Sequence, residues 1–472
     1  MYRLPLLACL CLGCALTPAW AGDTWWQHDP ATPGDWFKPA NWTAGVPGPA
    51  DYAYVDNAGT AHIGTGIAAA DRLYLGYTST GAGTIQLVGA ELESSSSLCV
   101  GYDGLGIFAQ AGGTNIADSL TLASNAHSTG LYYLMEGEVR APWGERIGRG
   151  GAGCFTQTGG TNSTNHSIDL GFAVGSLGTY ELSGGEVRCG SLYIGEYGTG
   201  VFAHTGGSNV VGYSVVLGQK EQSMGTYQLS ADGQLSAVYE TVGWSGRGQF
   251  TQTGGSNTVG QRLLIGDEPG SHGTYRLDGT GQLAVGNEIR VGSEGTGRFE
   301  WYGGVLDTPT LGLSGRGTLA MGYDFDVSDL FSAALLANPG VISGLQVGTV
   351  EVTNQATATH VRDSFGFGNL RIESTGRYEL TRGTLEIAAG LHIEGELDCA
   401  GSKATINAGD NSLVDLCKGR VLNAGQATLA VGANSLTIYA AGAHPSDLFG
   451  SFETQGMTHR AGKTLVIPAR KG

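Results

Sequence analysis

The chain has 472 residues, of which 81 are glycine, and 42 acidic against 25 basic residues give a net charge of −17. Glycine at about 17% is more than twice its usual share, yet 13 prolines are too few for collagen, and the many β-branched and aromatic residues exclude an elastic linker. The acidic balance disfavours a nucleic-acid-binding surface, because phosphates would be repelled. With 41% apolar residues the chain can bury a core.

Residues 1–21 have the pattern of a signal peptide. Arg3 is the only charged residue, an apolar run extends from Leu4 to Leu16, and Ala19-Trp20-Ala21 provides a small-x-small cleavage site. No later stretch reaches the 18 or more apolar residues of a membrane helix. We therefore expect cleavage after Ala21, export to the periplasm, the cell surface or the medium, and no membrane span in the mature chain.

Residues 22–50 are rich in tryptophan and proline, and two interpretations fit them. Trp25, Trp26, Trp36 and Trp42 lie within 18 residues. Exposed indoles stack on sugar rings, which makes these four residues the candidates for carbohydrate binding. Such a cluster also closes the open end of a repetitive core, whose first repeat has no neighbour on one side. We favour the second role and predict an N-terminal cap.

An internal repeat organises residues 51–319. The phrase Phe-x-Gln-x-Gly-Gly-x-Asn alternates with Gly-Thr-Tyr-x-Leu, and their aromatic residues share one column that covers 214 residues in nine steps, about 23.8 residues each. The column contains Ile85, Phe108, Tyr132, Phe155, Tyr180, Phe202, Tyr227, Phe250, Tyr275 and Phe299. A second column, the apolar residue before glycine in [Leu/Ile/Val]-x-[Leu/Ile/Val]-Gly, has the same period from Leu75 to Leu313. Two residue classes with one period indicate a solenoid.

The alternation of apolar residues in short runs that end at glycine is typical of strands and excludes helices. Residues 178–195 contain three such runs, GTYEL, EVRC and SLYIG. The sequence therefore predicts an all-β fold, a right-handed parallel β-helix with about 24 residues per coil and capped ends. Equivalent residues of successive coils would stack at about 4.8 Å, with the aromatic column as an interior ladder and glycine at the corners.

Polar residues that recur within the repeat are interpreted as structural. They are Asn115, Asn162, Asn209 and Asn257, with Gln110, Gln157, His204 and Gln252 five residues earlier in each copy. In the intervening coils both positions are apolar, so they tolerate burial. We expect these side chains to bond the backbone of neighbouring coils.

Beyond residue 319 the pattern becomes irregular. We expect residues 320–442 to continue the solenoid with an insertion and residues 443–472 to form a C-terminal cap or tail. Asp324, Asp326 and Asp329 form the one dense acidic group, a candidate calcium site whose alternative is a solvated loop. Cys399 and Cys417 could form a disulfide, although isolated packed thiols are the favoured interpretation.

The leader, Trp25-Trp26, the segment NWTAGVPGPAD at 41–51 and the two repeat phrases resemble exported bacterial β-solenoid proteins related to autotransporter passenger domains, with their autotransporter-associated β-strand repeats. The resemblance covers residues 25–319. It implies a β-solenoid and export, but this fold hosts adhesins, stalks and polysaccharide-degrading enzymes alike.

No motif in the sequence assigns an activity. The N-T-D, D-D and G-H-G motifs of polygalacturonase-like enzymes do not occur, nor do H-E-x-x-H or G-x-S-x-G. We therefore expect no cofactor and an exported, non-enzymatic scaffold or adhesin-like protein whose partners are polysaccharides or cell-surface components. The alternative is a carbohydrate-active β-helix protein, either a polysaccharide lyase or hydrolase or a carbohydrate-binding module.

Overall fold

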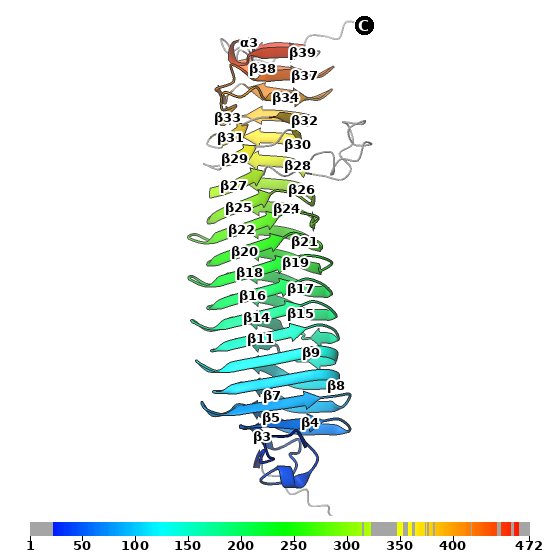
Figure 1. Ribbon diagram of the computed structural model, residues 1–472. Coiled ribbons are helices and arrows are strands. Elements are labelled where there is room, and N and C mark those ends of the chain that lie inside the picture. The colour runs from blue at the N-terminus through cyan, green and yellow to red at the C-terminus, as the bar shows by residue number, and fades with distance from the viewer. Residues whose placement is uncertain are drawn as a thin grey trace, which may run out of the picture.

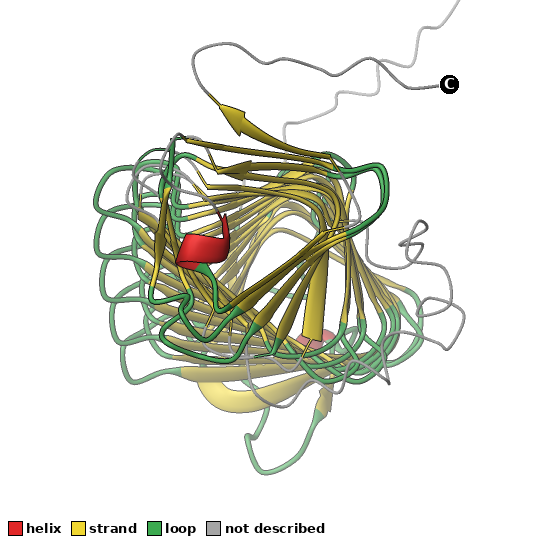
Figure 2. Ribbon diagram, turned by 90° about the horizontal axis from the view of Figure 1, so that it is seen from above, coloured by secondary structure: helices red, strands yellow, loops and turns green. Residues whose placement is uncertain are grey.

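The computed structural model describes residues 22–313, 316–321, 347–352, 357–360, 364–372, 374, 377–380, 383–416, 418–440, 445–454 and 457–461. They form a parallel β-solenoid of about 15 turns with coils of about 23 residues, as the sequence predicts (Figure 1). The predicted signal peptide, the three aspartates of the candidate calcium site and Cys417 lie outside the described residues. Seen along the stack, the strands enclose the core and the loops project outward (Figure 2).

One sheet, which we call the ladder sheet, holds the first strand of each coil in parallel register. Its strands in stacking order are β2 (Gly34–Asp35), β4 (Asn57–Ile63), β6 (Ala82–Leu87), the first parts of β8 (Leu105–Leu122) and β9 (Thr129–Arg140), β11 (Ala152–Gln157), β14 (Leu177–Leu182), β16 (Thr199–His204), β18 (Met224–Leu229), β20 (Arg247–Gln252), β22 (His272–Leu277), β25 (Thr296–Trp301), β27 (Arg316–Met321), β29 (Thr357–His360), β31 (Arg377–Leu380), β33 (Glu396–Asp398) and β36 (Arg420–Leu422).

The remainder of each coil supplies the other two sides of the solenoid, and in many coils the second and third runs join into one strand. In β15 (Glu186–Ile194) the register shifts between Cys189 and Ser191, where the strand bends. The other strands are β1 (Asp23–Trp25), β3 (Tyr52–Val55), β5 (Ile67–Leu75), β7 (Glu91–Val100), β10 (Glu145–Ile147), β12 (Thr161–Ser163), β13 (Ser167–Leu170), β17 (Ser208–Leu217), β19 (Gln234–Val242), β21 (Ser256–Ile265), β23 (Gln282–Val285), β24 (Glu288–Val291), β26 (Val305–Leu313), β28 (Val347–Val352), β30 (Ser364–Ile372), β32 (Thr384–Ile393), β34 (Thr405–Ala408), β35 (Leu413–Leu416), β37 (Thr428–Val431), β38 (Leu436–Ala440), β39 (Ser451–Thr454) and β40 (Met457–Ala461). Among the described residues, a 3-10 turn at Pro39–Asn41 and the short helix α3 (Pro445–Leu448) lie toward the two ends.

The interior aromatic ladder is confirmed. From Phe108 to Tyr275 eight rings stack with centroids 4.5–4.8 Å apart and planes within 9° of parallel. Each ring is fully buried, and Phe299 ends the series with a tilt of 41°. Because the ring spacing equals the spacing of hydrogen-bonded strands, every coil adds one strand and one ring to the same core.

The alternation of phenylalanine and tyrosine has a hydrogen-bonding cause. The hydroxyl of Tyr180 donates to Oε1 of Gln157 (2.5 Å) and accepts from Nδ2 of Asn162 (3.1 Å), both from the preceding phenylalanine coil. Nε2 of Gln157 donates to the carbonyl oxygens of Gly160 and Glu186. The glutamines therefore do bond the backbone, as expected. The asparagines instead bond the tyrosine hydroxyl, which corrects the expectation of a backbone partner.

Histidine replaces glutamine in one coil without changing this arrangement. Nδ1 of His204 lies 2.9 Å from the hydroxyl of Tyr227, and Nε2 lies 3.2 Å from the carbonyl oxygen of Gly207. Burial lowers the pKa of His204 to about 4. A neutral ring with its proton on Nε2 accepts from the tyrosine and donates to the carbonyl, so His204 is a core histidine.

The Gln157 side chain makes three hydrogen bonds in this network, and their contribution to stability can be tested. Replacement Gln157→Leu leaves the Tyr180 proton without its acceptor and two carbonyls without their donor. We expect a loss of about 2–3 kcal/mol in the free energy of unfolding, measured by urea denaturation. Leu134→Met, at the equivalent position of an intervening coil, is the control and should cost less than about 1.5 kcal/mol. Equal losses would show that volume rather than hydrogen bonding decides.

Glycine fills two facing columns at the corner before each ladder strand. Gly171 has φ +67°, and a Cβ on Gly178 would lie 2.1 Å from the carbonyl oxygen of Ile147 and 2.3 Å from the amide of Gly171. At each position of the second column the nearest backbone atom would lie 1.8–2.3 Å from an added Cβ, and the column consists of Gly83, Gly106, Gly130, Gly153, Gly178, Gly200, Gly225, Gly248, Gly273 and Gly297. The corner thus brings backbone against backbone, which confirms the predicted corner role of glycine.

Two glutamates interrupt an otherwise apolar interior column. Glu145 is in register with Leu120 and Ile168, and Glu240 with Val215 and Leu263, and both are 1% exposed. Oε2 of Glu145 accepts from Nδ2 of Asn162 at 3.0 Å, and Glu240 makes the same contact with Asn257. Burial raises the pKa of each carboxyl to about 7.

The N-terminal tryptophans cover the first coils. Trp26, Trp36 and Trp42 are at most 3% exposed, and Trp42 meets the other two rings edge-to-face at 5.0 and 4.7 Å. Nε1 of Trp42 donates to the carbonyl oxygen of Trp36. The amides of Trp26 and Trp36 donate to the carbonyl oxygens of Tyr54 in β3 and His62 in β4, so these tryptophans lie against the first coils. Cys399 is a free, buried thiol, which matches the favoured interpretation of packed cysteines.

Candidate functional site

The outward side of the glycine corner carries the richest chemistry in the regular part of the solenoid. We define the outer strip as the outward residues just before and after the corner glycine in successive coils. Its first column contains Trp25, Tyr54, Tyr74, Cys99, Thr121, Arg146, Asp169 and Tyr193, which are register partners. Its second column contains Tyr77, Tyr102, Ser124, Arg149, Phe172, Glu196 and Tyr197, with Lys220 from the next coil.

The N-terminal half of the outer strip is a cluster of five aromatic rings. Trp25 stacks on Tyr54 at 4.2 Å, Tyr54 on Tyr74 at 5.2 Å, and Tyr77 on Tyr102 at 5.0 Å. Edge contacts of 4.9 and 5.3 Å join Tyr77 to Tyr54 and Tyr74. All but Tyr54 are partly exposed, so the cluster presents ring faces and hydroxyls to solvent.

The C-terminal half of the outer strip is ionic. The guanidinium of Arg146 lies 4.6 Å from the centroid of Phe172 and 3.9 Å from a carboxylate oxygen of Asp169. One coil further, the ammonium of Lys220 lies 5.8 Å from the centroid of Tyr197. Each cation is thus held over a ring, an arrangement that fixes a long side chain with little loss of exposure.

Two carboxyls of the ionic half are perturbed. Burial raises the pKa of Glu196 to about 7, and the charge of Asp169 raises it further while Arg146 and Lys220 lower it. Burial also raises the pKa of Asp169, which is 7% exposed although it points outward. Glu196, with a pKa of about 7, can donate or accept a proton near neutral pH, and the raised pKa of Asp169 makes it a weaker acid than an ordinary aspartate.

The described residues contain no group of three or more histidine, cysteine, aspartate or glutamate side chains that could hold a metal ion. Within the same part of the chain, no helix has the length and apolarity needed to cross a membrane. The rings, carboxyls and cations of the outer strip offer aromatic stacking, hydrogen bonding and proton exchange.

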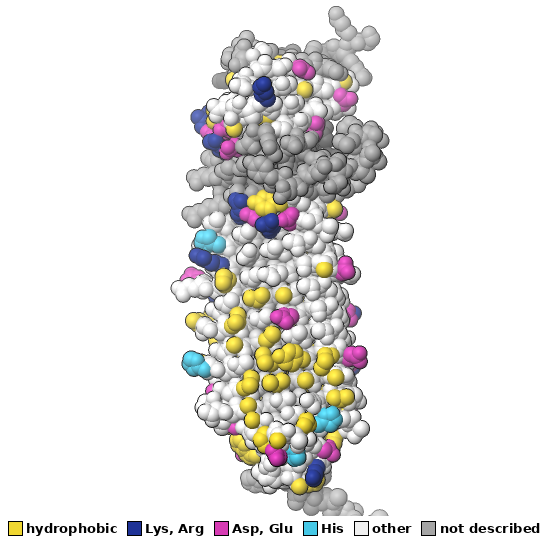
Figure 3. Space-filling model, viewed as in Figure 1, with side chains coloured by type: hydrophobic (Ala, Val, Ile, Leu, Met, Phe, Trp, Pro, Cys, Tyr) yellow, Lys and Arg dark blue, Asp and Glu magenta, His cyan; other side chains and the backbone are white. Residues whose placement is uncertain are grey.

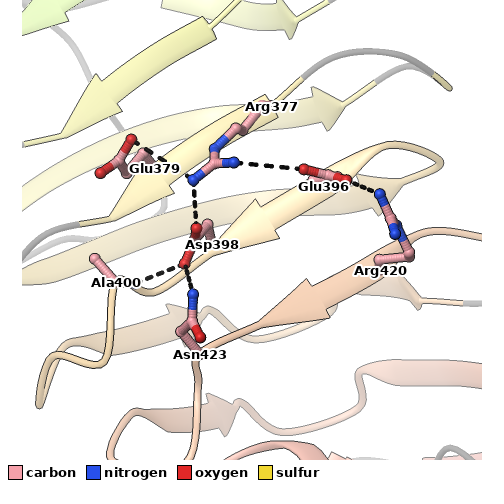
Figure 4. A network of polar contacts seen from close by, with 7 residues as sticks. All are labelled: Arg377, Glu379, Glu396, Asp398, Ala400, Arg420 and Asn423. Carbon is pink, nitrogen blue, oxygen red and sulfur yellow. Dashed lines mark hydrogen bonds and ion pairs between the residues drawn. The ribbon is translucent and has the colours of Figure 1, made fainter.

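A second polar network crosses three C-terminal coils (Figure 4). Arg377 of β31 contacts Asp398 at 2.5 Å and Glu396 at 3.7 Å, and Arg420 of β36 pairs with Glu396. Burial alone would raise the pKa of Asp398, but hydrogen bonds from Asn423 and the Ala400 amide, with the charge of Arg377, lower it. Because every charge here is paired between adjacent coils, the network holds coils together and offers no free group.

The structure separates the four tryptophan candidates. Trp25 belongs to the outer strip and is partly exposed, whereas Trp26, Trp36 and Trp42 are buried and cannot present a ring face to a sugar. The other strip residues were not singled out from the sequence, because outward positions do not repeat. One signal was present: Tyr77, Tyr102, Phe172 and Glu196 each directly follow the corner glycine of the [Leu/Ile/Val]-x-[Leu/Ile/Val]-Gly phrase.

Comparisons with known proteins do not add to this geometry. No family model, no curated protein and no solved structure matches the chain. The fold is therefore defined by the structure itself, as an all-β parallel solenoid.

Proposed function

We propose that this chain is an exported, non-enzymatic β-solenoid that acts as a rigid extracellular or cell-surface scaffold and holds a partner, adhesin-like, on its outer strip. The observation that carries the proposal is a difference between the interior and the outward side chains of the solenoid. From Phe108 to Phe299 the interior positions are used in packing and internal hydrogen bonds, whereas chemically varied residues gather on the outside. The sequence of residues 1–21 supports export.

A polysaccharide or another cell-surface component rich in hydroxyl groups fits the aromatic half of the strip. Ring faces pack against the apolar faces of sugars, and tyrosine hydroxyls and strip cations hydrogen-bond to their hydroxyls. Successive coils repeat at about 4.8 Å, so an extended polymer that runs along the solenoid meets an equivalent position at each coil.

Binding to a panel of immobilised polysaccharides and to whole cells tests the proposal. We expect the double variant Tyr77→Ala/Tyr102→Ala to bind about 5- to 150-fold more weakly, since each ring contributes roughly 0.5–1.5 kcal/mol. Tyr213→Ala/Tyr239→Ala is the matched control, because these two tyrosines also form an exposed pair, 5.5 Å apart, outside the strip. Equal weakening by both double variants, or no binding by the unmodified protein, would refute the proposed role of the strip.

The ionic half supports a second candidate, a carbohydrate-active enzyme. Glycoside cleavage needs two carboxyl groups in different protonation states at one bond, and Asp169 and Glu196 lie on adjacent coils with Arg146 beside them. Incubation with acidic polysaccharides distinguishes the candidates. Product formation that Glu196→Gln abolishes would establish the enzyme, whereas binding without product supports the scaffold.

A further inference from the structure

We infer that the solenoid pairs with a second copy of itself through the outer face of its ladder sheet, with the two rods antiparallel. This pairing is independent of what the outer strip binds. The face consists of the outward side chains of seven consecutive strands, β6, β8, β9, β11, β14, β16 and β18, which we call the neutral face. The strand registers place these strands side by side in that order.

The neutral face is unusual for a chain of net charge −17. Among the three outward residues of each of its seven strands, Glu181 is the one charged side chain. Leu105, Tyr133, Leu177 and Met224 are 37–47% exposed on it. Figure 3, which looks onto this face, shows mainly uncharged and apolar side chains over its central part and charges mostly toward its margins.

The surfaces beside the neutral face carry charged side chains, and these mark where the neutral face ends. The next ladder strands bring Arg247, Arg276 and Asp278, the last two joined at 2.5 Å. Around the other corner, the second runs of the coils carry pairs such as Arg188 with Glu186 at 2.6 Å. Two copies approach without charge repulsion at contact when they meet through the neutral face.

The size of the neutral face suits a stable dimer. Six residues of a strand span about 20 Å and seven strands span about 34 Å, so a pair buries about 1,300 Å² in total. Stable interfaces begin at about 1,200 Å². A flat sheet face is self-complementary about a twofold axis, and two such faces pack about 10 Å apart.

The position of Glu181 selects the antiparallel arrangement. β14 is the fifth of the seven strands, so a parallel pair would set Glu181 against the same strand of its partner. An antiparallel pair centred on β11, the fourth strand, sets it against the third strand, β9, where Leu131 and Tyr133 are outward. The like charges are then kept apart.

Sedimentation equilibrium of the protein over a range of concentrations tests the inference. We expect twice the monomer mass, with a dissociation constant that changes little with salt. Tyr133→Glu and Val201→Glu each add one carboxylate per copy, so the dimer interface gains two. Each substitution should weaken the dimer about 100-fold. Tyr213→Glu, at an exposed tyrosine outside the face, should leave it unchanged. Two face variants are used so that a folding defect in one, seen by circular dichroism, leaves the other informative.

A cross-linking experiment tests the register. Cys154 lies outward on the central strand and is only partly buried, whereas Cys99, Cys189 and Cys399 are buried. A short thiol-reactive cross-linker should join two copies through Cys154, and Cys154→Ser should abolish the product. A monomer at all concentrations, or a dimer that both face variants leave intact, would overturn the inference.

Discussion

The double variant Glu145→Gln/Glu240→Gln is expected to be more stable than the unmodified protein at pH 9 and to match it at pH 4. Both glutamates are buried and each accepts one hydrogen bond, from Asn162 and Asn257 respectively. Their pKa of about 7 lies above the 4.5 of an unfolded chain. A group whose folded pKa is raised binds more protons in the folded state, so its contribution to stability falls as the pH rises.

The pH window follows from these two values. Below about pH 4.5 the carboxyls are protonated in both states and contribute no pH dependence. Between about 4.5 and 7 the unfolded chain loses its protons while the folded chain keeps them, so the stability of the folded protein falls. Above about 7 both states are deprotonated, and stability falls no further. Each glutamate then lowers the free energy of unfolding by about 3 kcal/mol, since one pKa unit corresponds to about 1.4 kcal/mol.

Glutamine reproduces the protonated form at every pH. Oδ1 of Asn162 and Oε1 of Glu145 have no hydrogen-bond partner among the described residues. A protonated carboxyl carries an O–H donor, and a glutamine amide at position 145 carries an N–H donor at every pH. Urea unfolding at pH 4, 7 and 9 measures the difference between variant and unmodified protein, which removes the contribution of other titrating groups. Parallel profiles for the two proteins would contradict the prediction.

The coils without a buried glutamate supply a control. Asn115 bonds the hydroxyl of Tyr132 as Asn162 bonds that of Tyr180, but the position that corresponds to Glu145 is Leu98. Glu145→Leu therefore imitates an arrangement that the chain already uses. We expect this variant to lose the same pH dependence.

What the sequence could predict is what repeats. The ladder, the coil length and the corner glycines were accessible because the same residue type returns every 23 or 24 residues. The tyrosine network was also within reach: Gln157 and Asn162 sit in a phenylalanine coil and Leu182 in a tyrosine coil, an alternation that pairs each hydroxyl with an asparagine and with a glutamine or, at Tyr227, a histidine.

What escaped prediction is what departs from the repeat. Glu145 and Glu240 replace an apolar residue in the [Leu/Ile/Val]-x-[Leu/Ile/Val]-Gly phrase, and only those departures mark them. Arg146, Asp169 and Glu196 lie in columns without a constant residue type, since an outward side chain is not packed between neighbours in a core. Their proximity depends on register, which the structure supplies.

The variant Gly178→Ala is expected to be among the most destabilising single substitutions in the chain. A Cβ at this position would lie 2.1 Å from the carbonyl oxygen of Ile147 and 2.3 Å from the amide nitrogen of Gly171. These are backbone atoms of hydrogen-bonded coils and cannot rotate away as a side chain can. Relief requires the corner to open, which also disturbs the ladder strand that begins beside it. We expect a loss of at least about 3–4 kcal/mol.

Gly175→Ala separates this steric effect from backbone strain. Gly175 lies three residues away with φ +79°, and a Cβ there meets nothing within 4 Å. Alanine at that φ costs about 1–2 kcal/mol, so this control measures the loss of stability that the backbone conformation alone causes. Urea unfolding of both variants gives the comparison, and hydrogen exchange of the amides of β14 and β16 locates the damage. Because each coil contacts only its neighbours, Gly178→Ala should expose these strands first and leave the C-terminal coils protected. If the two variants lose equal stability, the corner tolerates a methyl group, and close backbone approach does not explain why this column is glycine throughout the regular coils.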